Sequence, residues 1–335
     1  MFDRLKCNLC GDCLVRCQYI GYDKAKAVQQ ISEIIEGKNA EILRDCITCV
    51  GCNEYCPTGA DPFDLINELQ EKYAALPVSE RTRGTMDMAP LVPSEIRVGQ
   101  PGKPVLSLCI MERLLPADAI QGKLFDELTI LKGGDYFCYI GYVHIGMASP
   151  PLKNARKFVD NLAATGAKEI VFLHDDCWVE CNKKVPEAGV TLPFKPVHVL
   201  EYLRNYLKDN KSNISKLNIK IAYQRPCASR YTPEKDSLVD EIFELTGVER
   251  VARRHDRENA LCCGAAILGV YRERAPKYQE MNIEDALRNG AEAMVTLCPM
   301  CYRILSKVAP ERGLPVIYIT DLCRMALGEK TFPGK

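Results

Sequence analysis

From about residue 104 onward, short apolar runs alternate with longer amphipathic stretches. The runs VLSLC, EIVFL, IKIAYQ, AMVTLC and VIYI are predominantly apolar, which is typical of strands buried on both faces of a sheet. The stretches NARKFVDNLAATG, EKDSLVDEIFELTG and YQEMNIEDALRNG show a helical period and end at Gly, a residue favoured just past a helix C-terminus. This alternation predicts an α/β architecture with mainly parallel sheets.

The first 80 residues show helical patterns without strand-like runs. The stretches DKAKAVQQISEIIEG and DPFDLINELQEKYAAL predict two long helices. We expect Asp61 to cap the second of these helices, with Pro62 at its first position. Residues 81–103 are rich in Pro, Gly and mixed charge, which predicts a linker or a wrapping arm.

The α/β region also repeats itself. The segment from Gly166 to Cys177 aligns without a gap on the segment from Gly290 to Cys301, and the polar stretch KDNKSNISK separates the two copies. Internal similarity of this kind predicts tandem modules. We therefore expect a helical domain, a linker and two α/β modules, at residues 1–80, 81–103, 104–207 and 218–335.

Composition narrows the class of protein. The 335 residues carry 44 Lys and Arg against 44 Asp and Glu, and this zero net charge argues against binding to nucleic acid or to an anionic membrane. The longest apolar run, from Ala260 to Tyr271, has 12 residues, whereas a membrane span needs about 20, so we expect no transmembrane segment. The N-terminus lacks a signal-like apolar region, which predicts a cytoplasmic protein that reaches a membrane only through a partner.

The 18 cysteines are the most unusual feature, and eight of them repeat one motif. The spacing C-x2-C-x2-C-x3-C occurs twice, and in this pattern the fourth thiolate ligates the other of two clusters. It predicts two [4Fe–4S] cubanes, one held by Cys7, Cys10, Cys13 and Cys56, the other by Cys46, Cys49, Cys52 and Cys17. Structural zinc is the alternative, but zinc ribbons use pairs of cysteines.

Five further cysteines follow the pattern C-x34-C-C-G-x33-C-x2-C. They are Cys227, Cys262, Cys263, Cys298 and Cys301. Adjacent cysteines form a disulfide only under strain, but they can ligate neighbouring metals, and Gly264 permits a positive φ beside them. Since ligands at strand ends converge on one crevice of an open α/β sheet, we expect a single metal centre here.

This CCG motif resembles the cysteine-rich domain of heterodisulfide reductase catalytic subunits. The order of a dicluster ferredoxin domain and two CCG modules also resembles that family, so the resemblance covers nearly the whole chain. Related subunits serve anaerobic glycerol-3-phosphate, lactate and glycolate oxidation and sulfite reduction. The resemblance implies an α+β multi-domain fold, with a helical dicluster ferredoxin domain followed by two tandem α/β modules. It further implies a non-cubane [4Fe–4S] centre held by the five cysteines, against the alternative of a cubane or zinc site using four of them. Gln18 departs from the family, which usually has Pro there.

The first α/β module has an incomplete version of this cysteine pattern. Its corresponding residues are Cys109, Cys138, His174 and Cys177, with Cys181 nearby. His174 aligns with Cys298, so a five-cysteine centre cannot be built by simple matching. Four Cys and one His offer ligands for zinc or for a further iron–sulfur cluster. The alternative is a degenerate repeat whose thiols only pack as small hydrophobic groups.

Together these motifs predict an iron–sulfur subunit of a larger redox complex. Electrons would enter through the ferredoxin domain and reach the CCG centre, which would reduce a disulfide or a comparable two-electron acceptor. No convincing dinucleotide motif is present, so we expect flavin, hydrogenase or dehydrogenase chemistry on partner subunits. The alternatives are a pure electron-transfer relay between a dehydrogenase and a quinone-linked or flavin partner, and an assembly scaffold with structural metals.

Overall fold

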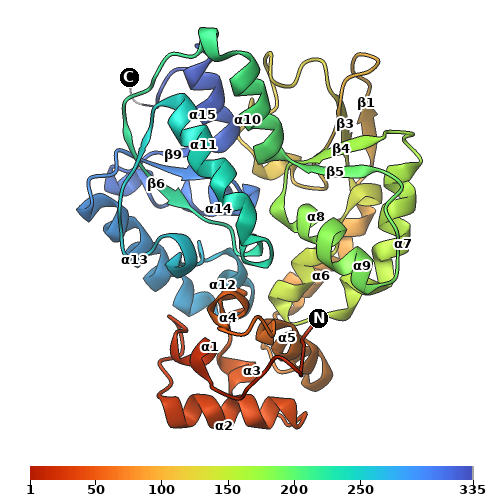
Figure 1. Ribbon diagram of the computed structural model, residues 1–335, viewed down its shortest axis with the longest axis vertical. Coiled ribbons are helices and arrows are strands. Elements are labelled where there is room, and N and C mark those ends of the chain that lie inside the picture. The colour runs from red at the N-terminus through yellow and green to blue at the C-terminus, as the bar shows by residue number, and fades with distance from the viewer. Residues whose placement is uncertain (334–335) are drawn as a thin grey trace.

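The computed structural model describes residues 1–333. Figure 1 shows the N-terminal helices at the bottom of the molecule and two sheet-containing modules side by side above them. Residues of the first module form the sheet on the right of this view, and residues of the second module form the sheet on the left. This arrangement confirms the predicted fold class, an α+β protein with a helical part followed by α/β modules.

The N-terminal part is helical, as the sequence predicted. Its helices are α1 (Asp12–Val15), α2 (Lys24–Ile35), α3 (Ile42–Asp45), α4 (Gly51–Tyr55) and α5 (Pro62–Tyr73). The carboxylate of Asp23 accepts a hydrogen bond from the backbone N–H of Lys26 and so caps α2. The buried face of α2, including Ile31 and Ile34, shares one small core with Ile66 of α5.

The start of α5 differs from the prediction. Asp61 occupies the N-cap position, but its φ of 54° is left-handed and its side chain makes no capping hydrogen bond. Instead, Oδ1 of Asn53 in α4 accepts a hydrogen bond from the N–H of Phe63 at 2.7 Å. The helix start is therefore satisfied from α4, which fixes the second cysteine loop against α5.

The first module contains a five-stranded sheet in the order β1-β3-β2-β4-β5, in which only β1 runs antiparallel to its neighbour. The strands are β1 (Glu95–Arg97), β2 (Val105–Ser107), β3 (Thr129–Lys132), β4 (Glu169–Phe172) and β5 (Lys195–His198). The helices are α7 (Ser149–Ala163), α8 (Asp175–Val179), α9 (Val185–Glu187) and α10 (Val199–Asp209).

Residues 81–103 contain regular structure instead of a plain linker. Helix α6 (Glu80–Met88) bridges the two modules, since Thr82 donates a hydrogen bond to the carbonyl of Gly269 and Tyr142 donates one to that of Met86. Strand β1 then pairs with β3 at the edge of the sheet. The segment therefore contacts both modules and adds an edge strand to the first sheet.

The second module contains a parallel four-stranded sheet in the order β7-β6-β8-β9. The strands are β6 (Lys220–Gln224), β7 (Glu249–Arg250), β8 (Ala293–Thr296) and β9 (Val316–Tyr318). The helices are α11 (Asp236–Thr246), α12 (Ala265–Val270), α13 (Ala275–Arg288), α14 (Pro299–Leu305) and α15 (Ile319–Ala326). Within residues 1–333, no helix combines the length and apolar character needed to cross a bilayer.

The two modules share a hydrophobic core. One buried cluster includes Leu106 and Val171 from the first sheet together with Ile221 and Val295 from the second. This cluster continues across the predicted boundary near residues 207–218, so the core does not mark where one module ends. The exact domain limits therefore stay a prediction.

A buried polar network also joins the modules. Asp175 of α8 is fully buried and lies 2.6 Å from Nε2 of His198, while Ser229 and Lys235 of the second module also contact its carboxylate. Burial opposes ionisation of this carboxyl, but Lys235 and His198 hold the pKa of Asp175 well below its ordinary value. The network therefore contains a carboxylate whose partners come from both modules.

We expect Asp175→Ala to destabilise the protein by about 3–5 kcal/mol, because it leaves buried Lys235 without its compensating charge. Chemical denaturation followed by circular dichroism measures this loss. Glu249→Gln, which removes an exposed ion pair with Lys220 at 3.8 Å, serves as the control and should cost about 1 kcal/mol or less. Equal effects of the two substitutions would contradict a structural role for Asp175.

Candidate metal centres

Four thiols from the two ferredoxin-like motifs surround one cavity. This inner thiol set consists of Cys17, Cys46, Cys49 and Cys52. Thr48 and Val50 both adopt positive φ, and the N–H of Thr48 points at Cys46 Sγ over 3.3 Å. Four thiols around a common space, with a backbone donor directed at sulfur, fit a four-iron cube.

The other four motif cysteines form a second group. This outer thiol set consists of Cys7, Cys10, Cys13 and Cys56. Burial and the neighbouring thiols Cys56, Cys10 and Cys7 raise the pKa of Cys13 to about 12. Gly11 is required beside this set, because its φ is 73° and a Cβ there would lie 2.9 Å from the backbone N of Val28. The assignment of the eight thiols to two clusters and their binding of iron both stay predictions.

Two cysteines of the second module follow its central strands β6 and β8, and the adjacent pair lies just before α12. This CCG thiol set consists of Cys227, Cys262, Cys263, Cys298 and Cys301. Cys227 follows β6, Cys298 precedes α14 and Cys301 lies in its first turn. The thiols form a chain of contacts in which Cys262 touches Cys227 and Cys263, Cys263 touches Cys301, and Cys301 touches Cys298. All five are free thiols, so the adjacent pair Cys262 and Cys263 is available as ligands.

Gly264 fixes the turn that carries the adjacent cysteines. Its φ is 95°, and its N–H donates to Cys262 Sγ over 3.3 Å. A Cβ at this position would approach Nε2 of Gln279 to 2.6 Å. The backbone conformation therefore favours glycine here, and an added Cβ would have to displace the side chain of Gln279.

The first module brings three thiols together. The sulfur atoms of Cys109, Cys138 and Cys177, called here the first-module thiol set, lie within 4.8 Å of one another and are buried. They offer three of the four ligands that a zinc ion or a four-iron cluster takes. Cys181 is a buried residue of the π-helical turn η5 (Glu180–Lys184) and lies outside this set.

His174 does not join the first-module thiol set either. Its Nε2 lies 3.5 Å from Cys298 Sγ of the second module, so its ring faces the CCG thiol set. A hydrogen bond from Cys301 and the charge of His174 lower the pKa of Cys298 to about 6, although burial acts in the opposite direction. Burial also disfavours the imidazolium, but Asp176 and Cys298 raise the pKa of His174 to about 10. The two side chains are therefore arranged as an imidazolium–thiolate pair.

Two residues that contact the thiol sets escaped the sequence analysis. Tyr19 follows Cys17 by two residues, and its hydroxyl accepts a hydrogen bond from the N–H of Cys262 at 2.7 Å. Arg230 follows Cys227 by three residues and lines the cavity of the inner thiol set. Both residues lie close in sequence to predicted cysteine ligands, and this was the one hint that the sequence offered. Their contact partners lie in another part of the chain, so no local pattern reveals these contacts.

The fold and the thiol sets can now be compared with known proteins. Residues 221–306 match the family model described as the cysteine-rich domain CCG, and all five cysteines of the CCG thiol set fall within the matched range. This match and the relatives described next support a heterodisulfide reductase-like iron–sulfur subunit.

The relatives are named as subunits of the dihydromethanophenazine:CoB–CoM heterodisulfide reductase. The protein from Methanosarcina barkeri is 28% identical over 198 residues, which are 57% of this chain and 48% of the relative. The protein from Methanosarcina mazei is 29% identical over 222 residues, which are 63% of this chain and 54% of the relative. The chain thus spans about half the length of these curated relatives.

A solved structure supports the fold alone. A hypothetical protein from Helicobacter pylori superposes with a TM-score of 0.58 at 12% identity, over 84% of this chain and 61% of that protein. At this level of identity the similarity concerns the arrangement of elements and says nothing about shared chemistry.

We expect Gly264→Ala to remove the metal of the CCG thiol set. The inner and outer thiol sets should stay loaded. The added Cβ displaces Gln279 and strains the turn beside Cys263. Iron content per chain, measured after anaerobic purification, should fall by about four.

Gly290→Ala is the matched control, because Gly290 also has a positive φ of 77° but open space around its Cβ position. It should keep the full iron content at a cost of about 1 kcal/mol in stability. Full iron content in Gly264→Ala would show that the turn tolerates a side chain.

Proposed function

We propose that this chain is an iron–sulfur subunit of a multi-subunit oxidoreductase that reduces a disulfide. The outer and inner thiol sets hold two [4Fe–4S] cubanes, and the CCG thiol set holds a non-cubane [4Fe–4S] centre. When bound, these groups supply one-electron transfer and reductive cleavage, in which two electrons and two protons convert one disulfide into two thiols. The electrons come from a partner subunit of the flavoprotein, hydrogenase or dehydrogenase class.

The observation that carries this proposal is the contact between the inner thiol set and the CCG loop. The hydrogen bond from Cys262 to Tyr19 joins a residue beside Cys17 to the adjacent cysteines. Tyr19 also packs edge to face on Tyr278 of α13, with ring centroids 4.8 Å apart. These contacts hold the two sets of ligands in a fixed relation, which electron transfer between them requires.

The residues around the CCG thiol set also suit thiol chemistry. The imidazolium of His174 holds its proton next to Cys298 Sγ and stabilises a thiolate there. Cys298, Cys301 and His174 are all buried, so bulk water has little access to them. Such surroundings strengthen the charge interaction and favour a thiolate as a ligand or as a leaving group.

A second candidate function is a pure electron-transfer relay between a dehydrogenase and a quinone-linked or flavin partner. It is favoured by the first-module thiol set, which has three clustered thiols where the second module has five cysteines. A relay needs only the chain of centres and no substrate site.

Anaerobic purification with counting of iron and zinc should give about 12 irons per chain, or about 16 if the first-module thiol set holds a further cluster. Reduced viologen should then drive turnover of a soluble disulfide by the loaded protein. Full loading without turnover would favour the relay, whereas zinc in place of iron would contradict both functions.

Replacing Cys263 by Ser should abolish the paramagnetic state that appears when a thiol is added to the oxidised protein. The ferredoxin signals should persist, because Cys263 belongs to neither ferredoxin-like set. Electron paramagnetic resonance measures both. Cys323→Ala is the control, since Cys323 is fully buried in the shared core and belongs to none of the thiol sets. An unchanged signal in the Cys263 variant would show that the substrate-responsive centre lies elsewhere.

A further inference from the structure

A buried arginine of the second module reaches into the ferredoxin-like part. Arg230 lies in the short helix η7 (Ala228–Tyr231), one turn beyond Cys227. Only 4% of the residue is exposed, and its side chain lines the cavity formed by the inner thiol set. It is thus a cation that connects two predicted metal centres.

Two of the three guanidinium nitrogens are held by backbone carbonyls from different parts of the chain. One terminal nitrogen donates to the carbonyl of Cys49 at 3.1 Å, and the other donates to Ala260 at 2.6 Å and to Glu258 at 3.3 Å. Cys49 belongs to the inner thiol set, and Ala260 precedes Cys262 by two residues. The arginine fork therefore fixes the inner cysteine loop against the CCG loop.

The third nitrogen has no hydrogen-bond acceptor among the described residues. The buried Nε of Arg230 is unsatisfied. A Cβ placed on Gly51 would lie 3.7 Å from this Nε and 3.4 Å from Cys49 Sγ, so both atoms face the same small space. A buried N–H without an acceptor is costly, and a thiolate or sulfide in this cavity would satisfy it.

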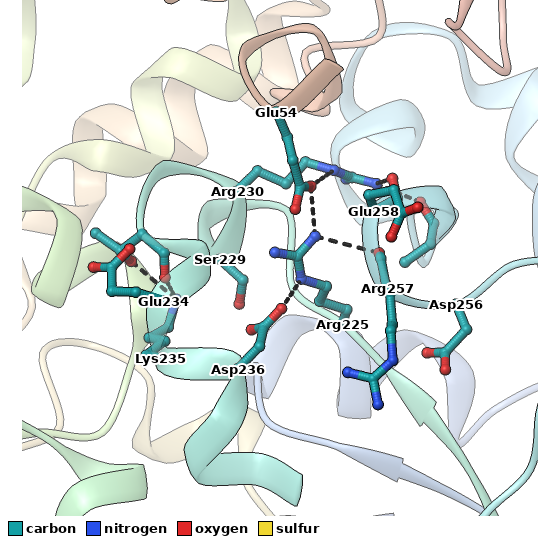
Figure 2. A network of polar contacts seen from close by, with 12 residues as sticks. Glu54, Arg225, Ser229, Arg230, Glu234, Lys235, Asp236, Asp256, Arg257 and Glu258 are labelled. Atoms are coloured by element: carbon teal, nitrogen blue, oxygen red, sulfur yellow. Dashed lines mark hydrogen bonds and ion pairs between the residues drawn. The ribbon is translucent and has the colours of Figure 1, made fainter. Parts of the chain in front are cut away.

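Arg230 also shares its carboxylate partner with a second arginine. Figure 2 shows Glu54 between Arg225 and Arg230. Oε2 of Glu54 lies 2.6 Å from Arg225 but 3.6 Å from Nε of Arg230, and Arg225 has a second carboxylate partner in Asp236. Two arginines thus share Glu54, with the shorter contact going to Arg225. Since backbone carbonyls carry no net charge, a buried guanidinium of this kind is best stabilised by an anionic group in the cavity.

We propose that Arg230 tunes the electron-transfer potential of the centre held by the inner thiol set, by donating its Nε–H to that centre and placing a positive charge beside it. This inference rests on the proposed function. Reduction of the centre adds one electron, and so one negative charge, without breaking a bond; the electron comes from the partner subunit named above. The cation stabilises this reduced form more than the oxidised form and raises the reduction potential. Arg230 thus makes reduction of the centre held by the inner thiol set more favourable.

The test is a potentiometric titration of the full chain, purified anaerobically and followed by electron paramagnetic resonance. Arg230→Gln should shift the midpoint potential of one cubane to more negative values and leave the other cubane unchanged. Arg230→Lys, which keeps the charge but loses the planar fork, should give a smaller shift in the same direction. Iron counting establishes that each variant is loaded.

Arg253→Gln is the matched control. Arg253 of the second module also has a buried side chain whose Nε lacks a hydrogen-bond acceptor, but Asn282 and the carbonyl of Tyr223 bind its guanidinium, and it does not line the cavity of the inner thiol set. Its substitution should leave both potentials unchanged. Equal shifts in the Arg230 and Arg253 variants would show a general effect of losing a buried arginine and overturn the inference.

A second measurement uses the wild-type protein and so does not depend on the folding of a variant. Selective 15N labelling of arginine should give a hyperfine coupling between an arginine nitrogen and one reduced cubane. Absence of this coupling, or unchanged potentials in loaded Arg230→Gln, would overturn the role of Arg230 and leave the proposed function intact. Absence of iron from the wild-type ferredoxin-like part would instead overturn the proposed function itself.

Discussion

The rest of this structure depends on one constraint, which is that many thiols lie close together with little access to water. Burial raises the pKa of Cys13 and of Cys17 to about 12, with neighbouring cysteines adding to the effect. Thiolates at these positions therefore require nearby positive charge. Iron would supply most of it, and the chain itself contributes Arg230 at the inner thiol set and His174 at the CCG thiol set. These cations lie on parts of the chain distant from the cysteines they face.

This arrangement explains why three parts of the chain meet at the inner thiol set. His144 of the first module contacts the carbonyl of Thr48 over 2.9 Å, beside Cys49. Arg230 of the second module holds the carbonyl of Cys49 itself, and Tyr19 of the N-terminal part binds the CCG loop. The cysteine loop is thus fixed from both modules. A loop held on several sides changes its geometry little on reduction, which suits rapid electron transfer.

The local features of the fold could be predicted from the sequence because they follow from local patterns. The repeat alignment places Glu169 over Ala293, and these residues begin β4 and β8. The same alignment places Asp175 over Pro299, and these residues begin α8 and α14. Hydrophobic periodicity and cysteine spacing depend on neighbours in the chain. Helices, strands and groups of cysteines could therefore be predicted from them.

The parts that escaped prediction depend on contacts between distant segments. The arm at residues 81–103 gains its strand only because β3 offers an edge to pair with, and β3 itself was missed. Asn53 replaces Asp61 as the cap of α5 because α4 packs against that helix. The direction of His174 depends on how the modules face each other, which no local pattern encodes. Tertiary contacts decided each of these features.

The difference between the two modules is best understood from His174. The repeat alignment places this histidine where the second module has Cys298, and in the folded protein the two residues meet at 3.5 Å. A cysteine at position 174 would bring two thiolates together at the junction, with mutual repulsion in a buried site. A histidine there instead supplies a positive charge to Cys298. The neighbouring Asp175 anchors the same turn through Ser229 and Lys235 of the second module. The incomplete module therefore has a structural role whether or not its own three thiols bind a metal, because it places His174 against Cys298 at the CCG thiol set.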